Sequence, residues 1–417
     1  MKSIDELIAE LCPGGVTYKE LWQLTIWDKK FNEVEREKQP TTISYHYFLA
    51  DELEKMVVPG GSVKLLTTSP SNIFTTEEVA ADNVSIGEVV SIPWGGNPHV
   101  QYYKGKFLTA DNRIATSTNT TILDNKFLYY FMASKTQIIN SFYRGSGIKH
   151  PSMAKVLGLQ IPLPPLAVQK EIVRILDGFT GLIDELENEL AARRKQYEQY
   201  RDRLLALGDG VERKPLGTLI ISLKTGLNPR TNFKLNTKES VCPYVTGKDV
   251  FNNTINITDR TDKIESNVVA LINKRACIEN GDVLFASTGT GTVGRMAIVC
   301  DYHGDWAVSE TMYCLKPQSK SVSSKFLMYS LSSSNAVGQY EPKISRGSVP
   351  HLRVDDLLNV KIATPPLAEQ KRIVEILDKF DALCNDATAG LAAEIAARKK
   401  QYEYYCDKLL TFKRKAS

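Results

Sequence analysis

The side chains of this sequence that are best suited to chemistry are cations, imidazoles and amides in polar loops. Arginine and lysine neutralise phosphates, and arginine, asparagine and histidine can also pair with the edges of bases. Aromatic residues such as Trp94, Tyr102 and Tyr103 are interleaved with these loops. On chemistry and loop position we therefore select a set of candidate DNA-binding residues: Asn97, Arg144, Lys149, His150, Arg295, Lys343, Arg346 and His351.

Two Arg-Gly-Ser sequences, which begin at Arg144 and Arg346, have two interpretations. Glycine often follows the last residue of a helix because it adopts a left-handed backbone conformation without strain, so each sequence fits a helix stop. A loop at a helix end can equally present its side chains to DNA. Both interpretations remain open at this point.

Patterns typical of catalysis or of a bound nucleotide are weak. The sequence Gly289–Gly294 spells GxGxxG after a strand-like run, but the residues that follow read as a second strand, which favours a hairpin or glycine-rich loop. Gly247-Lys248-Asp249 lacks the spacing of a phosphate-binding P-loop, and we find no Asn-Pro-Pro-Tyr adenine methyltransferase signature. We therefore expect a non-catalytic protein with no metal site.

The composition describes a soluble globular chain. Its 417 residues are 42% hydrophobic and 24% charged, which allows two to four domains, and the net charge of +4 permits a nucleic-acid partner without requiring one. The seven cysteines show no CxxC spacing, which argues against a disulfide framework or a zinc ribbon. With no signal peptide or membrane-spanning run in the sequence, we expect a cytoplasmic protein without a membrane partner.

An internal repeat is the strongest signal in the chain. Residues 164–205 and 365–410 share the pattern PPLAxQKxIVxILD, followed by AARxKQYExYxxxLL. The offset between the copies grows from 201 at Pro164 and Pro365 to 205 at Gln196 and Gln401, so the second copy carries four extra residues. Fixed-period similarity of this kind indicates a duplicated structural unit.

The segments before each copy also repeat, but more faintly. Short matches occur in the same order, such as Lys126-Phe127-Leu128 with Lys325-Phe326-Leu327. Strand-like runs at 62–66, 88–92, 282–286 and 296–299, with one helical pattern near the end of each segment, predict an α+β fold. The predicted organisation is a helix at 1–13, globular segments at 14–162 and 209–363, and helical segments at 163–208 and 364–417.

The helical segments carry apolar and aromatic residues at steps of three and four. This heptad rhythm predicts two long helices that pair as an antiparallel coiled coil, in which the four-residue insertion acts as a stutter. A helix of about 40 residues reaches roughly 60 Å. The predicted seam of this coiled coil comprises Phe179, Ile183, Leu186, Leu190, Arg193, Tyr197, Tyr200, Leu204, Leu391, Ile395, Arg398, Tyr402, Tyr405 and Leu409.

The duplicated PPLAxQK helix, each copy placed after a divergent α+β segment, resembles the specificity subunit of type I restriction–modification enzymes. The resemblance covers essentially the whole chain. It implies that 14–162 and 209–363 are target recognition domains, which read the two halves of a bipartite, asymmetric sequence in double-stranded DNA. It also implies that the helices form the spacer and dock two methylation subunits.

The chemistry implied by this resemblance lies in partner subunits. Methylation subunits would carry S-adenosylmethionine and modify adenines, and restriction subunits would use ATP and magnesium. Two other hypotheses remain at this stage. One is a protein-interaction scaffold with no DNA role, and the other is an enzyme that binds a nucleotide at Gly289–Gly294, which requires a helix after Gly294.

Overall fold

The computed structural model describes residues 2–208, 210–385 and 390–415. The chain forms two compact units, and the division falls inside its long helices. The first unit comprises Met1–Glu185 with Ala396–Ser417, and the second comprises Leu186–Ile395. Each unit therefore contains one globular segment and parts of both helical segments. Among the described residues, no helix is both long enough and apolar enough to cross a membrane.

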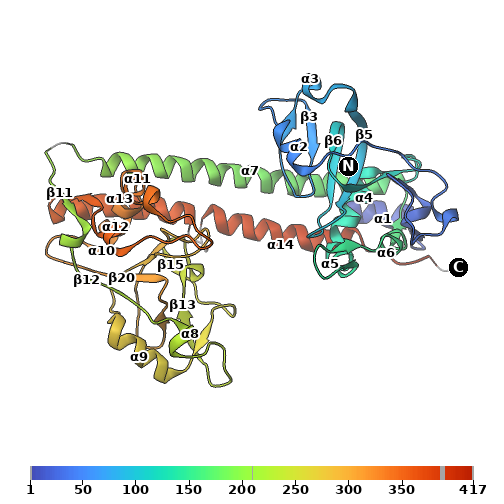
Figure 1. The fold of residues 1–417 in the computed structure, drawn as a ribbon. Helices are drawn as coiled ribbons and strands as arrows, with labels where there is room; N and C mark the ends of the chain where they lie inside the picture. Colours follow the sequence, from blue (N-terminus) through green and yellow to red (C-terminus); the bar gives the residue numbers. More distant parts are fainter. Residues whose placement is uncertain (1, 209, 386–389, 416–417) are drawn as a thin grey trace. The chain divides into compact units, whose positions relative to one another are not determined.

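The first unit is built on one six-stranded sheet. All neighbouring strands are antiparallel except β3 and β6, which are parallel. Helix α4 (Asn125–Ser134) packs against the sheet, and α5 (Thr136–Ser141) follows it (Figure 1). The strand order is β2 (Thr25–Trp27), β7 (Asn112–Ser117), β5 (Ser85–Pro93), β6 (Gln101–Thr109), β3 (Val63–Leu66) and β4 (Phe74–Thr75).

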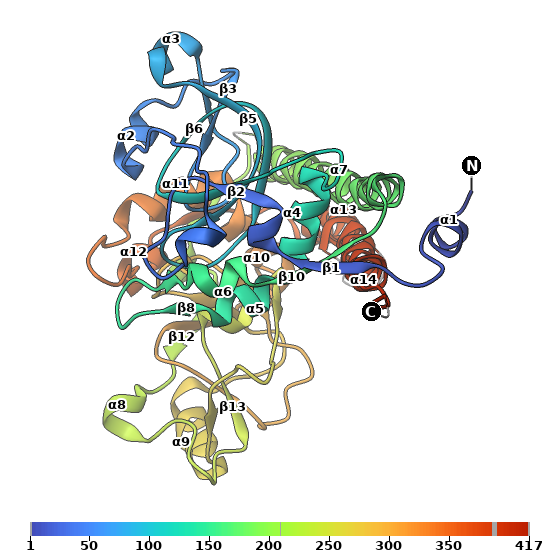
Figure 2. The same ribbon diagram turned by 90° about the vertical axis from the view of Figure 1, so that its right-hand side faces the viewer.

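The two ends of the chain meet in the first unit. Ser3 caps helix α1 (Ile4–Leu11), and its side chain forms a capping box with Glu6. Figure 2 shows α1 beside the C-terminal end of α14 (Leu391–Leu409). Backbone hydrogen bonds join Val16 to both Lys413 and Lys415 (2.9 Å each), so the last described residues complete the first unit.

The second unit repeats four consecutive strands of this sheet, starting from its β2 edge. The order β12 (Ile220–Thr225), β20 (Met312–Pro317), β17 (Val283–Ala286), β18 (Met296–Ile298) matches β2, β7, β5, β6. Helices α10 (Ser324–Ser332) and α11 (Ser334–Tyr340) correspond to α4 and α5. The α+β prediction is confirmed, and so are the strands and helices that the sequence predicted near these positions.

The remainder of the second unit differs from the first. A small sheet contains β16 (Lys263–Ile264), β13 (Cys242–Val245) and β19 (Ala307–Val308), and α9 (Ser266–Ala276) lies next to it. These elements lie on the side of the unit away from α10 and α13 (Leu367–Asn385), as Figure 1 shows.

The glycine-rich sequence Gly289–Gly294 connects β17 and β18, which pair as an antiparallel hairpin. A dinucleotide site of the GxGxxG type requires a helix after the last glycine, because the N-terminus of that helix faces the pyrophosphate. The nucleotide-binding hypothesis is therefore wrong, and the hairpin interpretation is confirmed.

The long helices begin just after their Pro-Pro pairs. Helix α7 (Leu166–Leu205) has 40 residues, and its counterparts in the second copy are α13 and α14. Within each unit the paired helices run in opposite directions (Figure 1), with Phe179 stacked on Tyr405 at 5.0 Å in the first unit and Tyr200 against Phe380 at 5.3 Å in the second. The run 391–398, which lies at the predicted stutter, falls in α14, whereas residues 386–389 just before it lie outside the described residues.

The buried face of these helices departs from a strict heptad. Arg193 is exposed and bonds Glu189, and Tyr200 remains 48% exposed, whereas Leu205 is more buried than the predicted Leu204. A straight helix has 3.6 residues per turn, so its buried stripe drifts by about 20° per heptad from a 3.5-residue repeat. Of the other predicted seam residues, Ile183, Tyr197, Ile395 and Leu409 are buried, and Phe179, Leu186, Leu190, Leu391, Arg398, Tyr402 and Tyr405 are half-buried.

A buried glutamine ties each long helix to its globular segment. Gln370 accepts a hydrogen bond from the backbone N–H of Ser323 (3.0 Å) and donates to the carbonyls of Ser321 and Pro365 (2.9 Å each). Gln169 makes the same three bonds to the loop before α4 and to Pro164. Both glutamine side chains are fully buried, so these contacts explain why the glutamine of the Gln-Lys motif recurs in both copies.

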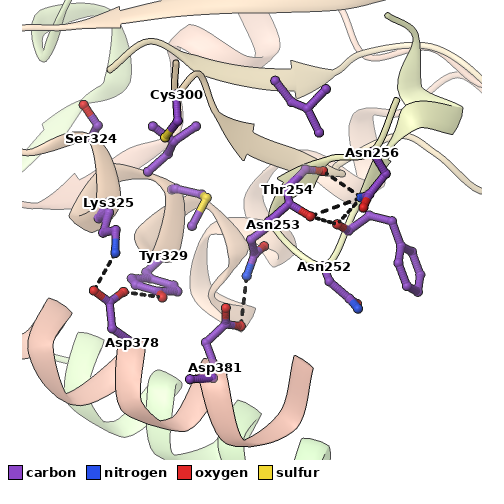
Figure 3. A pocket seen from close by; sticks show the side chains of 15 residues that line it. Asn252, Asn253, Thr254, Asn256, Cys300, Ser324, Lys325, Tyr329, Asp378 and Asp381 are labelled. Atoms are coloured by element: carbon purple, nitrogen blue, oxygen red, sulfur yellow. Dashed lines mark hydrogen bonds and ion pairs between the residues drawn. The ribbon is translucent and has the colours of Figure 1, made fainter. Parts of the chain in front are cut away.

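A repeated aspartate forms a second tie between helix and globular segment. Asp378 accepts from Lys325 (2.6 Å) and Tyr329 (2.8 Å), as Figure 3 shows. In the first unit Asp177 accepts from Lys126 (2.9 Å) and Tyr130 (2.5 Å). Burial, together with the hydrogen bond to the aspartate, raises the pKa of each tyrosine, so each phenol stays a neutral donor.

We expect Gln370→Ala to lower the free energy of unfolding of the second unit by about 2–4 kcal/mol, because it leaves a buried N–H and two carbonyls without partners. Urea denaturation of the purified chain measures the change. Gln199→Ala, at an exposed position of α7, is the matched control and should shift stability by less than about 0.5 kcal/mol. Equal midpoints for the two variants would contradict the assigned role of Gln370.

Candidate nucleic-acid interface

A short hairpin carries several of the candidate residues of the first unit. Strands β8 (Tyr143–Arg144) and β9 (His150–Pro151) pair antiparallel, with Arg144 opposite His150. At the bend, Gly145 has φ +146°, and a Cβ there would lie 2.7 Å from the carbonyl oxygen of Ile148. Helix α5 ends at Ser141, before this sequence, so the helix-stop interpretation of Arg-Gly-Ser is wrong.

The hairpin packs on the loop that follows β5. His150 Nδ1 lies 2.8 Å from the carbonyl oxygen of Trp94, and the two rings are 5.0 Å apart. The N–H of Gly96 donates to the carbonyl of Lys149 (3.1 Å), and the next residue of this loop is Asn97, which is exposed. The structure thus brings Asn97 close to the hairpin of Arg144, Lys149 and His150, which lies far from it in the sequence.

A buried ionic network supports the same loop. Arg113 donates to Asp28 (2.8 Å), and both side chains are buried. The guanidinium of Arg113 also lies 4.5 Å from the Trp94 ring, and Tyr47 donates to Asp28 (2.5 Å). The network fixes the position of Trp94, on whose backbone His150 rests. Sequence reasoning missed Arg113, because nothing in its neighbours signals that a strand arginine is buried.

The second unit repeats this arrangement with different residues. His351 Nδ1 lies 2.7 Å from Thr288 Oγ1, and the N–H of Gly289 donates to the carbonyl of Pro350 (3.0 Å). Ser345 pairs with His351 across the bend. In both units, therefore, the hairpin histidine contacts the loop that follows the equivalent strand, β5 or β17. Arg346 and Lys343 are exposed in the same segment.

Arg295 does not join this group. Its guanidinium lies 3.5 and 3.4 Å from the carbonyl oxygens of Gly247 and Val250, and it lines a pocket together with Arg194 and Tyr197 of α7. Its side chain is half-buried by these contacts. Arg295 therefore lies apart from Lys343, Arg346 and His351, because its loop meets the hairpin at Thr288 and Gly289 and faces α7 at Arg295. Its choice as a DNA-binding residue stays a prediction.

A larger pocket, of about 770 Å³, lies beside the hairpin formed by β14 (Val250–Phe251) and β15 (Thr254–Ile255). Asn253 donates to Asp381 of α13 (3.2 Å), and Figure 3 shows the two side chains pointing at each other. The sequence analysis did not find this pocket. Asn252-Asn253, both with positive φ, is the turn signal that would have shown the hairpin.

The two histidine-anchored hairpins present unpaired positive charge. The side chains of Arg144, Lys149 and Arg346 are exposed and form no ion pair with any described residue, whereas Lys343 lies 3.9 Å from Asp356. Among the described residues, no three His, Cys, Asp or Glu side chains gather into a possible metal site. Cations beside an imidazole and an amide can bind phosphates and read base edges.

Comparison with known proteins identifies the family. The family model described as "Type I restriction modification DNA specificity domain" matches residues 44–193 and 209–397. The specificity subunit of the Escherichia coli EcoR124I/EcoR124II type I restriction enzyme is 32% identical over 307 residues, which cover 70% of this chain and 72% of that protein. A putative type I specificity subunit of Haemophilus influenzae is also 32% identical, over 78% of this chain and 83% of its own length.

The fold agrees with this assignment. The crystal structure of the S subunit of a type I restriction–modification system from M. genitalium matches with a TM-score of 0.52 and 16% identity, and the match covers 95% of this chain and 96% of that one. Two matched specificity domains, a duplicated sheet core and duplicated helix anchors make this chain a member of the type I restriction–modification DNA specificity family.

Proposed function

We propose that this chain is the non-catalytic DNA-specificity subunit of a type I restriction–modification complex. Each unit reads one half of a bipartite, asymmetric sequence in double-stranded DNA. The observation that carries the proposal is the hairpin that recurs in both units, anchored by His150 in one and by His351 in the other. Both hairpins present unpaired cations, while the elements around them differ between the units.

Partner subunits supply the chemistry in this proposal. Two methylation subunits would bind S-adenosylmethionine and methylate adenine, and restriction subunits would use ATP and magnesium. The family supports docking of the methylation subunits on the long helices, whose outer faces expose apolar residues such as Leu182 and Leu383. DNA as the ligand implies a cytoplasmic location.

Adenine-methylation mapping tests the proposal. The chain and its methylation subunit are expressed in a host that lacks adenine methylation. We expect a two-part motif with a fixed gap, which disappears when this chain is omitted. If no new motif appears while the methylation subunit is active with another specificity subunit, the chain is a protein-interaction scaffold and the proposal is wrong.

The exposed cations of the first hairpin should contribute to DNA affinity. We expect Arg144→Ala with Lys149→Ala to weaken binding of the complex to its target about 10- to 100-fold and to reduce the slope of log K against log salt by about 2, because two phosphate contacts are lost. Titrations at several salt concentrations measure both quantities. Lys2→Ala with Lys55→Ala removes two exposed cations of the same unit outside the hairpin. Equal salt slopes for the two double variants would show that Arg144 and Lys149 do not contact DNA phosphates.

The helices should also set the gap between the half-sites. Deleting Leu391–Glu394 removes four residues of α14, or about 6 Å of helix. At about 3.4 Å per base pair, we expect the recognised gap to shorten by one or two base pairs while both half-sites stay the same. Replacing Leu391 and Glu394 by alanine keeps the helix length and should keep the gap. Altered half-sites in the deletion variant would show that α14 does not act as a spacer.

A further inference from the structure

Each histidine-anchored hairpin exposes one β-branched apolar side chain at its bend. Ile148 is 70% exposed and Val349 is 53% exposed. They occupy the same place in the repeat, because each lies two residues before the anchoring histidine, His150 or His351. Both loops contain Arg-Gly-Ser and the histidine, and between these they differ in sequence and in length, yet each has one exposed apolar residue there.

Folding does not account for these two side chains. The hairpins are held by their histidines and by backbone bonds, such as that from Gly289 to Pro350 (3.0 Å), and not by packing of the apolar residue. Ile148 stands over Gly95, since a Cβ on that glycine would lie 2.8 Å from Ile148 Cγ2. A β-branched side chain has few rotamers. Ile148 is therefore held in one place while most of its surface faces solvent.

The setting of these side chains indicates DNA as their partner. Arg144 and Lys149 flank Ile148, and Arg346 precedes Val349; all three cations are exposed. An apolar tip beside cations is the pattern of a side chain that enters a base stack while the cations bind the phosphates.

We propose that Ile148 and Val349 insert into the duplex at the adenine that is methylated in each half-site, and occupy the space this base leaves when it swings out. The inference rests on the proposed function and deepens it. An enzyme that modifies a base must first take it out of the stack. The two half-sites differ in sequence but share a target adenine, and the repeated hairpin is a loop element with exposed cations that the two units share.

The test uses the complete complex of this chain with its methylation subunits and a DNA fragment that carries the mapped target. One half-site is methylated beforehand, so that each fragment reports a single adenine. With Ile148→Ala we expect the methylation rate at saturating complex to fall at least 10-fold at one half-site, and less than 3-fold at the other. Val349→Ala should give the opposite pattern. Affinity for the target should change less than 3-fold in both variants.

Three controls separate insertion from a general surface effect. Ile86→Ala and Ile221→Ala remove apolar side chains that are 72% and 68% exposed, one in each unit, and should leave both rates unchanged. Ile148→Leu retains bulk and should keep the rate within 3-fold of the wild type. A fragment with no base opposite the target adenine, where unstacking is easier, should restore the rate of Ile148→Ala.

Two results would overturn the wedge assignment while the proposed function stands. One is a wild-type methylation rate in both alanine variants. The other is an equal loss at the two half-sites or a loss of affinity alone, which would make these side chains part of general DNA binding. Failure of the wild-type complex to methylate a bipartite target is a different result, and it would refute the proposed function itself together with the wedge.

Discussion

The structure depends on a small set of buried hydrogen bonds that join helix to globular segment. Gln169 and Gln370 each satisfy one N–H and two carbonyls in a loop that would otherwise bury unpaired backbone groups. About two turns further along each helix, Asp177 or Asp378 binds a lysine and a tyrosine of the helix packed against it. Leaving a buried polar group without a hydrogen-bond partner costs more free energy than a formed hydrogen bond contributes. These anchors therefore fix both the position and the orientation of each globular segment on its helix.

The anchors explain why the helical segments are nearly constant while the globular segments vary. A residue that makes three buried bonds has few acceptable substitutes, whereas a loop that faces solvent has many. Variation is thereby confined to elements such as β3 and β4 in the first unit and β13, β16 and α9 in the second. The hairpins anchored by His150 and His351 lie within the variable segments. Their backbone contacts to the loop after β5 or β17 are nevertheless the same in both units.

Much of the architecture could be predicted from the sequence, because the duplication places the same sequence patterns in the chain twice, once for each unit. The repeat, the α+β class and the start of the long helices all depend on local patterns. Which residues near Tyr200 are buried was less predictable, because buried stripes with periods of 3.5 and 3.6 residues diverge only after several helical turns. The candidate site was predictable where a motif recurred, as at His150 and His351. The orientation of Arg295 and the burial of Arg113 depend on contacts with residues distant in sequence, which no local pattern encodes.

The division of the chain into units has a consequence for its biosynthesis. The second unit is a continuous stretch, Leu186–Ile395, whereas the first also needs Ala396–Ser417 to complete its core. Domains generally fold as units while the ribosome still extends the chain. For this protein the order of synthesis and the order of completion are reversed, because all of Leu186–Ile395 is synthesised before the segment that completes the core of the first unit. The apolar surface that this segment covers must be tolerated or shielded until α14 has been synthesised.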